Sequence, residues 1–152
     1  MTKQLRGLLA GVAATVPMTG VIAVGRAVGW LGTPPPEQIT AAAAALAEVD
    51  DDLPPPVFDA TWVAAHLAYG GLCGAIYPSL RALLPSSIPA AGLAYGLAVW
   101  GASYVGLMPA LRLYPSPWRD RPSRTAVMVA AHAVFGIALA EAHRLLPEPS
   151  GQ

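Results

Sequence analysis

Four apolar segments dominate this 152-residue chain and leave it few ways to fold. They cover residues 7–31, 60–84, 88–111 and 125–146. Each is close to or above the roughly 20 residues that a helix needs to cross a hydrocarbon core about 30 Å thick. Only 12% of the residues are charged, which is about half the usual share in soluble domains. The sequence therefore predicts one all-α domain over residues 1–152, a four-helix transmembrane bundle in a lipid bilayer.

The second and fourth apolar segments resemble each other. Residues 64–85 read AAHLAYGGLCGAIYPSLRALLP, and residues 130–147 read AAHAVFGIALAEAHRLLP. The first and third segments also share a motif, GLLAGVA at 7–13 and GLAYGLA at 92–98. We therefore predict two tandem helical hairpins, over residues 7–84 and 88–146. Since each hairpin crosses the membrane twice, their pseudo-two-fold axis should lie along the membrane normal. The many glycines would let the helices approach closely.

The loop between the first two segments, residues 32–59, contains a shorter helical pattern. Proline triplets bracket EQITAAAAALAEV, in which apolar residues recur at helical spacing: Ile39, Ala43, Leu46 and Val49. The pattern predicts a short Ala-rich helix on the membrane surface or against the bundle. Thr33 is the expected N-cap, because a threonine hydroxyl accepts from the first free backbone N–H groups of a helix.

Two histidines, His66 and His132, occupy equivalent places in the similar segments. If their helices start near residues 60 and 125, the two rings lie about 9 Å and about 10 Å below the membrane boundary. Three roles are open for this pair. The histidines would make structural hydrogen bonds between helices, bind haem b as bis-histidine ligands, or carry protons in a minimal proton or small-solute transporter.

Other features narrow the function. The formal net charge is +0, so no nucleic-acid partner is expected. The single cysteine, Cys73, excludes an internal disulfide and a cysteine-only metal site. We find no phosphate loop, no HExxH and no G-x-S-x-G motif, so we expect no metal site, no catalytic residue and no enzyme activity. A loop clasp, or an anion site on its arginines, is predicted from Asp50, Asp51, Asp52, Arg119 and Arg121.

The order of these features resembles the YagU-like family of small bacterial inner-membrane proteins of unknown function. The shared features are a glycine-rich first helix leading into a proline cluster, a second helix with His66 that ends in proline, a third that ends at Pro109, and Ala-His-x-x-Phe-Gly at residues 131–136. The resemblance spans residues 7–144. It implies a multi-pass inner-membrane protein and supplies no catalytic residues.

Charge distribution suggests the orientation. The first loop has no Lys or Arg, and the first helix usually dominates topology, so we expect cytoplasmic termini. Together these observations predict a structural, accessory or stress-related membrane protein that partners another membrane protein or a second copy of itself. A small b-type cytochrome and a minimal transporter are the alternatives.

Overall fold

The structure, a computed structural model, describes residues 1–48 and 54–147, and all regular elements in this part of the chain are helical. The all-α prediction is therefore confirmed. In order, the elements are α1 (Lys3–Ala27), α2 (Pro35–Leu46), α3 (Pro55–Leu80), the 3₁₀ turn η1 (Arg81–Leu83), α4 (Ile88–Trp100), the π-helix η2 (Gly101–Leu107), α5 (Met108–Ala110), the 3₁₀ turn η3 (Pro117–Arg119) and α6 (Pro122–Leu145). From α4 through η2 to α5 the helical backbone is continuous.

Among the described residues, three helical segments are long and apolar enough to cross a membrane: Lys3–Ala27, Ile88–Ala110 and Pro122–Leu145. Each overlaps one of the predicted spans, and together they make this a multi-pass membrane protein. α3 has 26 residues but is not among the three. Its sequence carries a histidine, two tyrosines and a tryptophan, which lower its mean hydropathy. The fourth span, residues 60–84, therefore stays a prediction at this point.

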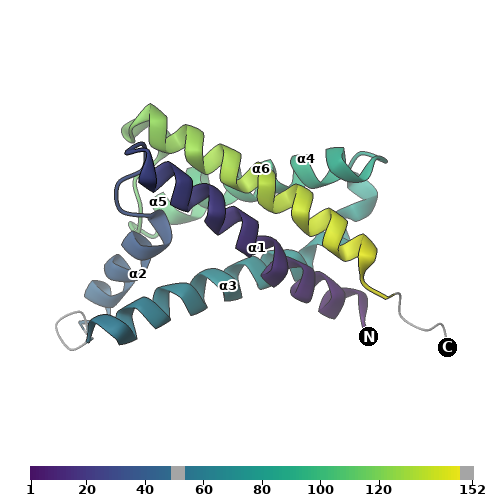
Figure 1. The fold of residues 1–152 in the computed structure, drawn as a ribbon, viewed down its shortest axis with the longest axis horizontal. Coiled ribbons are helices and arrows are strands. Elements are labelled where there is room, and N and C mark those ends of the chain that lie inside the picture. Colours follow the sequence, from purple (N-terminus) through teal and green to yellow (C-terminus); the bar gives the residue numbers. More distant parts are fainter. Residues whose placement is uncertain (49–53, 148–152) are drawn as a thin grey trace.

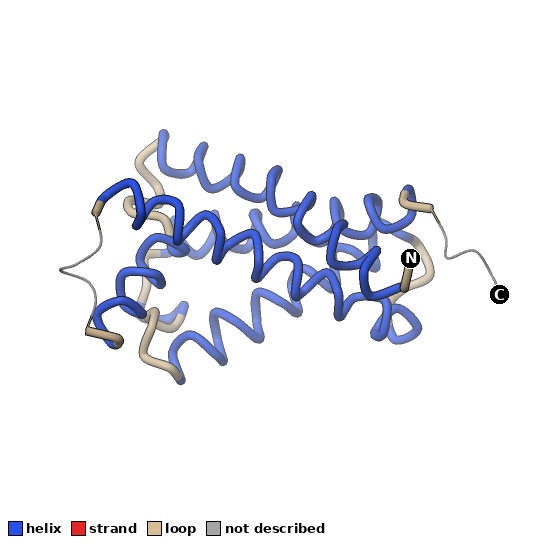
Figure 2. The backbone as a smooth tube through the Cα atoms, turned by 90° about the horizontal axis from the view of Figure 1, so that it is seen from below, coloured by secondary structure: helices blue, strands red, loops and turns tan. Residues whose placement is uncertain are grey.

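α1 and α6 form the centre of the molecule, side by side and antiparallel (Figure 1). α3 packs against α1, and α4 packs against α6. The start of α1 and the end of α6 lie at one end of the molecule, which we call the terminal end (Figure 2). α2 lies at the opposite end, the α2 end. The core between the helices contains Ala10, Met18, Ile22, Ala131, Phe135 and Leu139, all buried.

Glycines set the contacts within two of the helix pairs. A Cβ atom on Gly74 of α3 would lie 2.7 Å from Gly11 Cα of α1. A Cβ atom on Gly136 of α6 would lie 2.7 Å from Gly96 Cα of α4. No side chain fits at either place, so the backbones of α1 and α3, and those of α4 and α6, touch directly. This is the usual way in which helices associate in lipid.

Two arginines connect the ends of α1 and α6. Arg6 in the first turn of α1 is buried and donates through Nη2 to the carbonyls of His143, at 2.8 Å, and Leu146, at 3.0 Å. At the α2 end, Arg124 Nε donates to the Leu31 carbonyl at 2.8 Å. Arg6 thus pairs carbonyls that the C-terminus of α6 leaves without an intrahelical partner, whereas Arg124 binds the segment that follows α1.

The helix predicted in the first loop is confirmed as α2, but its cap differs. Pro34 is the N-cap, with no side-chain hydrogen bond, and Pro35 follows as the first helical residue. Proline suits this position because the first N–H groups of a helix have no intrahelical partner. Thr33 as N-cap was therefore wrong. α2 lies against α3 and forms an ion pair with α1, from Arg26 to Glu37 at 3.7 Å.

Candidate functional site

A cavity of about 240 Å³ lies between α2, α3, η2 and α6. We call it the histidine chamber and define it by its polar lining residues, Thr40, His66, Tyr69, Ser103, Tyr104 and His132. Its other walls include three methionines (Met18, Met108 and Met128), Ile39, Trp62 and two prolines of α2. None of the described residues that line it is an Asp, Glu, Lys or Arg. The chamber is therefore mainly apolar, with a few uncharged polar groups.

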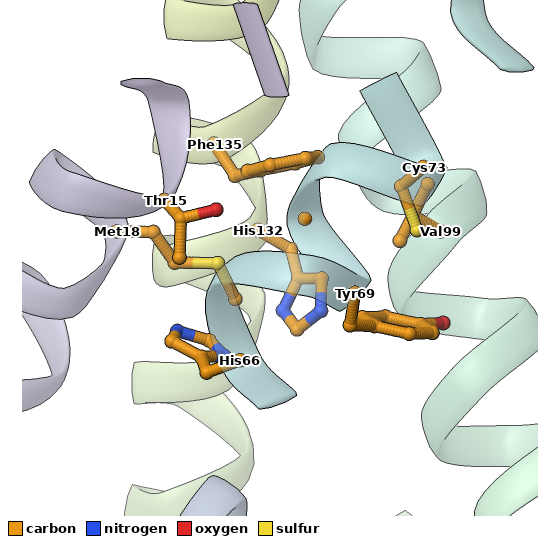
Figure 3. A pocket seen from close by; sticks show the side chains of 9 residues that line it. Thr15, Met18, His66, Tyr69, Cys73, Val99, His132 and Phe135 are labelled. Carbon is orange, nitrogen blue, oxygen red and sulfur yellow. The ribbon is translucent and has the colours of Figure 1, made fainter. Parts of the chain in front are cut away.

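His66 and His132 come together at the deep side of the chamber, as their equal levels in the sequence predicted. Both also line a void of about 20 Å³ beneath it (Figure 3). A void of that volume holds one water molecule at most. The chamber and this void are adjacent, because His66 and His132 line both of them.

Both histidines lie well inside their helices. At about 1.5 Å per residue, His66 is about 17 Å along α3 from Pro55, and His132 is about 15 Å along α6 from Pro122. The helices begin before positions 60 and 125, from which the depths below the membrane boundary were predicted, and those depths stay predictions. Both histidines are near the middle of their helices.

Within the described residues, neither histidine forms a hydrogen bond to another helix. His132 is buried, with 7% of its surface exposed, and its Nδ1 lies 2.8 Å from the Met128 carbonyl of its own helix. His66 Nε2 is buried with no hydrogen-bond partner in the described part of the chain. A buried polar atom without a partner costs free energy, about 1–3 kcal/mol in protein mutational data. The ring of His66 is therefore the least satisfied polar group in the chamber.

A π-helix forms the wall opposite the histidines. η2 interrupts the helix that the sequence predicted as one regular span over residues 88–111, and it brings Ser103 and Tyr104 into the chamber. Ser103 Oγ donates to the Val99 carbonyl at 2.6 Å and lies 2.6 Å from Tyr69 Oη of α3. π-helical turns inside α-helices occur frequently at functional sites.

A polar cluster closes the α2 end beside the chamber. Tyr104 donates its hydroxyl proton to Asp120, and Tyr114 donates to the same carboxylate at 3.3 Å. Arg124 lies 3.5 Å from Asp120 and donates to Tyr114 Oη at 3.1 Å. Burial raises the pKa of Tyr114 above its ordinary range. The cluster holds the segment before α6 against η2.

Between the chamber and the terminal end, side chains rather than glycines connect α3 to α4. We call this contact the α3–α4 seam and define it by Tyr69 with Ser103, Cys73 with Tyr95, and Tyr77 with Tyr95. Tyr95 donates its hydroxyl proton to the Cys73 carbonyl. The rings of Tyr77 and Tyr95 are buried and meet edge to face, 5.1 Å between centroids. These two rings close the seam on the terminal side of the chamber.

The predicted loop clasp lies partly outside the described residues, because Asp50, Asp51 and Asp52 fall in the segment 49–53. Arg119 and Arg121 are exposed. The ion pair found in that loop instead joins Asp120 to Arg124. In the described part of the chain, no group of three or more His, Cys, Asp or Glu side chains could hold a metal ion.

Sequence reasoning missed most of the chamber wall. Tyr69 follows His66 by three residues, so helical spacing could have placed both on one face. Ser103 and Tyr104 had no such signal, because the register change of a π-helix has no residue pattern of its own. Thr40 of α2 was also missed, since the loop helix was expected to have no binding role.

The fold and the chamber define a small, all-helical, multi-pass membrane protein with a mainly apolar cavity near the middle of its helices. The chain belongs to a family of unknown function, DUF6789, which it matches over residues 1–151. No curated protein and no solved structure matches it. The YagU-like family, which the sequence resembles, is also one of unknown function. Membership of the YagU-like family stays a prediction.

Proposed function

We propose that this chain is a four-span membrane protein with an accessory, non-catalytic role, and that it acts by binding a small molecule in the histidine chamber. The observation that carries this is the buried His66 Nε2, which has no partner among the described residues and belongs to a cavity large enough for a ligand. A ligand in the chamber would supply the missing partner. Ligand sites in membrane proteins commonly lie between helices near mid-depth.

The fourth span in this proposal is α3. Its support is topological: the start of α1 and the end of α6 lie at one end of the molecule (Figures 1 and 2), and α3 runs from the α2 end to the terminal end. When the first span starts and the last span ends on one side of a membrane, the number of crossings is even, so three crossings by α1, α4–α5 and α6 require a fourth. α3 is about 39 Å long, enough to span. The resemblance to the YagU-like family favours the bacterial inner membrane, and the charge distribution described above favours cytoplasmic termini.

The binding proposal is favoured over a purely structural role for the histidines. A structural pair would hydrogen-bond between helices, whereas His132 bonds within α6 and His66 Nε2 has no partner in the described chain. It is also favoured over haem. The chamber, at about 240 Å³, is below the range of about 300–1,000 Å³ that drug-sized ligands occupy, and a haem macrocycle is larger than those ligands.

A second candidate, passage of a small solute, is favoured by the α3–α4 seam. Glycine contacts fix α1 to α3 and α4 to α6, whereas tyrosine side chains bridge the seam and two rings close it. Side chains can change rotamer without separating helix backbones, so opening here would connect the chamber to the terminal end. Passage of glycerol and of urea would be measured with proteoliposomes, by stopped-flow recording of their shrinkage and recovery in each solute. If the rate of solute entry equals that of empty liposomes, passage of both solutes is eliminated.

The binding proposal is tested by filling the chamber. Ala65 lines it, and its neighbour Ala64 is exposed and does not. Binding of the probes indole and benzofuran to protein in lipid nanodiscs would be measured by calorimetry, with empty nanodiscs subtracted. We expect Ala65→Trp to abolish binding of at least one probe that the wild type binds, and Ala64→Trp to leave it unchanged. Equal binding by both variants would refute the proposal.

A further inference from the structure

The hydroxyl protons in the chamber are already committed to the protein. Ser103 Oγ donates to the Val99 carbonyl, and a hydroxyl has only one proton to give. The hydrogen bond between Ser103 and Tyr69 must therefore use the proton of Tyr69. Tyr69 Oη is left with lone pairs alone, so toward the chamber it can only accept.

The remaining polar residues follow the same pattern. Thr40 Oγ1 donates to the Pro36 carbonyl at 2.9 Å, and Tyr104 donates to Asp120. The indole N–H of Trp62 lies 3.3 Å from Asp59 Oδ1 and donates to it. Of these three side chains, the two hydroxyl oxygens can still accept a hydrogen bond, and none has an uncommitted proton.

His132 adds the strongest acceptor. A carbonyl cannot donate, so the contact with Met128 places the proton on Nδ1 and leaves Nε2 of the neutral ring as a lone pair. The ring is neutral because no described acid lines the chamber, and an unpaired charge buried among apolar groups costs far more than a neutral ring. His66 alone retains an N–H that the described protein does not use. Acceptors in the chamber thus outnumber donors.

We propose that the ligand of the histidine chamber is a neutral, mainly apolar molecule of one or two fused rings that brings its own hydrogen-bond donor, an O–H or N–H group, to His132 Nε2 and Tyr69 Oη. Phenols and indoles have this chemistry. Quinones and ketones, which only accept, would find a single donor at His66. The apolar walls and the volume of about 240 Å³ set the size and the neutrality of the ligand. This inference rests on the proposed binding function.

Indole and benzofuran test it as a matched pair, because they share one shape and differ in the ring N–H. Calorimetry with protein in nanodiscs should give about three- to tenfold tighter binding of indole, as expected for one additional hydrogen bond. The preference should fall toward one in His132→Phe or Tyr69→Phe. Tyr77→Phe removes a hydroxyl outside the chamber and should retain the preference. Thermal unfolding of each variant identifies those that fold.

The outcomes separate the two proposals. Equal binding of indole and benzofuran by the wild type would overturn the donor inference and leave the chamber as a binding site. A preference for indole that survives in both folded chamber variants would also overturn it, since the donor would then be recognised elsewhere. Absence of binding by either probe, with folded protein, would overturn the donor inference and count against the binding function as well.

Discussion

Replacing Gly136 by alanine tests the close contact between α4 and α6. Its new Cβ would lie 2.7 Å from both the Cα and the N of Gly96, and closer still to the Gly92 carbonyl oxygen. All three atoms are backbone, so no rotamer change relieves the overlap. Ordinary contact begins near 3.4 Å, so the helices would separate by at least about 0.7 Å, and a gap of that order loses about a quarter to a half of the dispersion attraction across an interface.

Two effects of opposite sign decide the result. Overpacking costs about 1–3 kcal/mol, and alanine in a helix gains about 1 kcal/mol over glycine. We expect Gly136→Ala to lower the free energy of unfolding by up to about 2 kcal/mol. Gly20→Ala is the matched control, because Gly20 is exposed on α1 and nothing lies within 4 Å of its Cβ position. It should raise the free energy of unfolding by up to about 1 kcal/mol.

Unfolding by sodium dodecyl sulfate in mixed micelles, followed by circular dichroism, measures both variants against the wild type. The signs should be opposite for the same chemical change. The contact would be refuted if Gly136→Ala were as stable as Gly20→Ala, because the backbones of α4 and α6 could not then be as close as described.

Two further predictions concern the ends of the helices. Arg6→Met removes both hydrogen bonds to the C-terminal carbonyls of α6 and should lower the free energy of unfolding by about 1–3 kcal/mol. Lys3→Met, at an exposed position, is the control and should change the free energy of unfolding little. Equal effects of the two substitutions would contradict the role of Arg6. Because burial raises the pKa of Tyr114 above 10.0, its stabilising contribution is present below pH 10 and declines as the pH rises above that value. Tyr114→Phe should reduce this alkaline decline when unfolding is measured from about pH 9 to pH 11, and an unchanged decline would refute it.

The long helices could be predicted because their signal is length and apolar composition, and bilayer thickness fixes both requirements. The equal levels of His66 and His132 were predictable too, since the two segments align on the same Ala-Ala-His. The starts of α3 and α6 were not, because Pro55 and Pro122 begin these helices and were taken for loop residues. Proline is ambiguous in a sequence, since it can end one element or open another.

The chamber itself could not be predicted from the sequence, for a different reason. Glycines were expected to let helices approach, and Gly11, Gly74, Gly96 and Gly136 do so, whereas Gly20 contacts nothing. Composition does not distinguish these two kinds of glycine, because the difference depends on which face meets a neighbour. The wall formed by η2 depends in the same way on a local change of helical register that tertiary packing selects. Of the chamber residues, the two histidines were predictable from the repeated motif, and Tyr69 could have been placed from its helical spacing to His66.

The pairing of α1 with α6 has a consequence for biosynthesis. Among the described long helices α1 is made before α6, yet the two lie side by side, with arginine hydrogen bonds near both ends of the pair. Until α6 is inserted, Arg6 does not have the α6 carbonyls to bind, and α4 does not have its glycine partner. Packing of these helices can therefore finish only after α6 has been made, and a nascent chain that ends before α6 would leave α4 without the helix against which it packs.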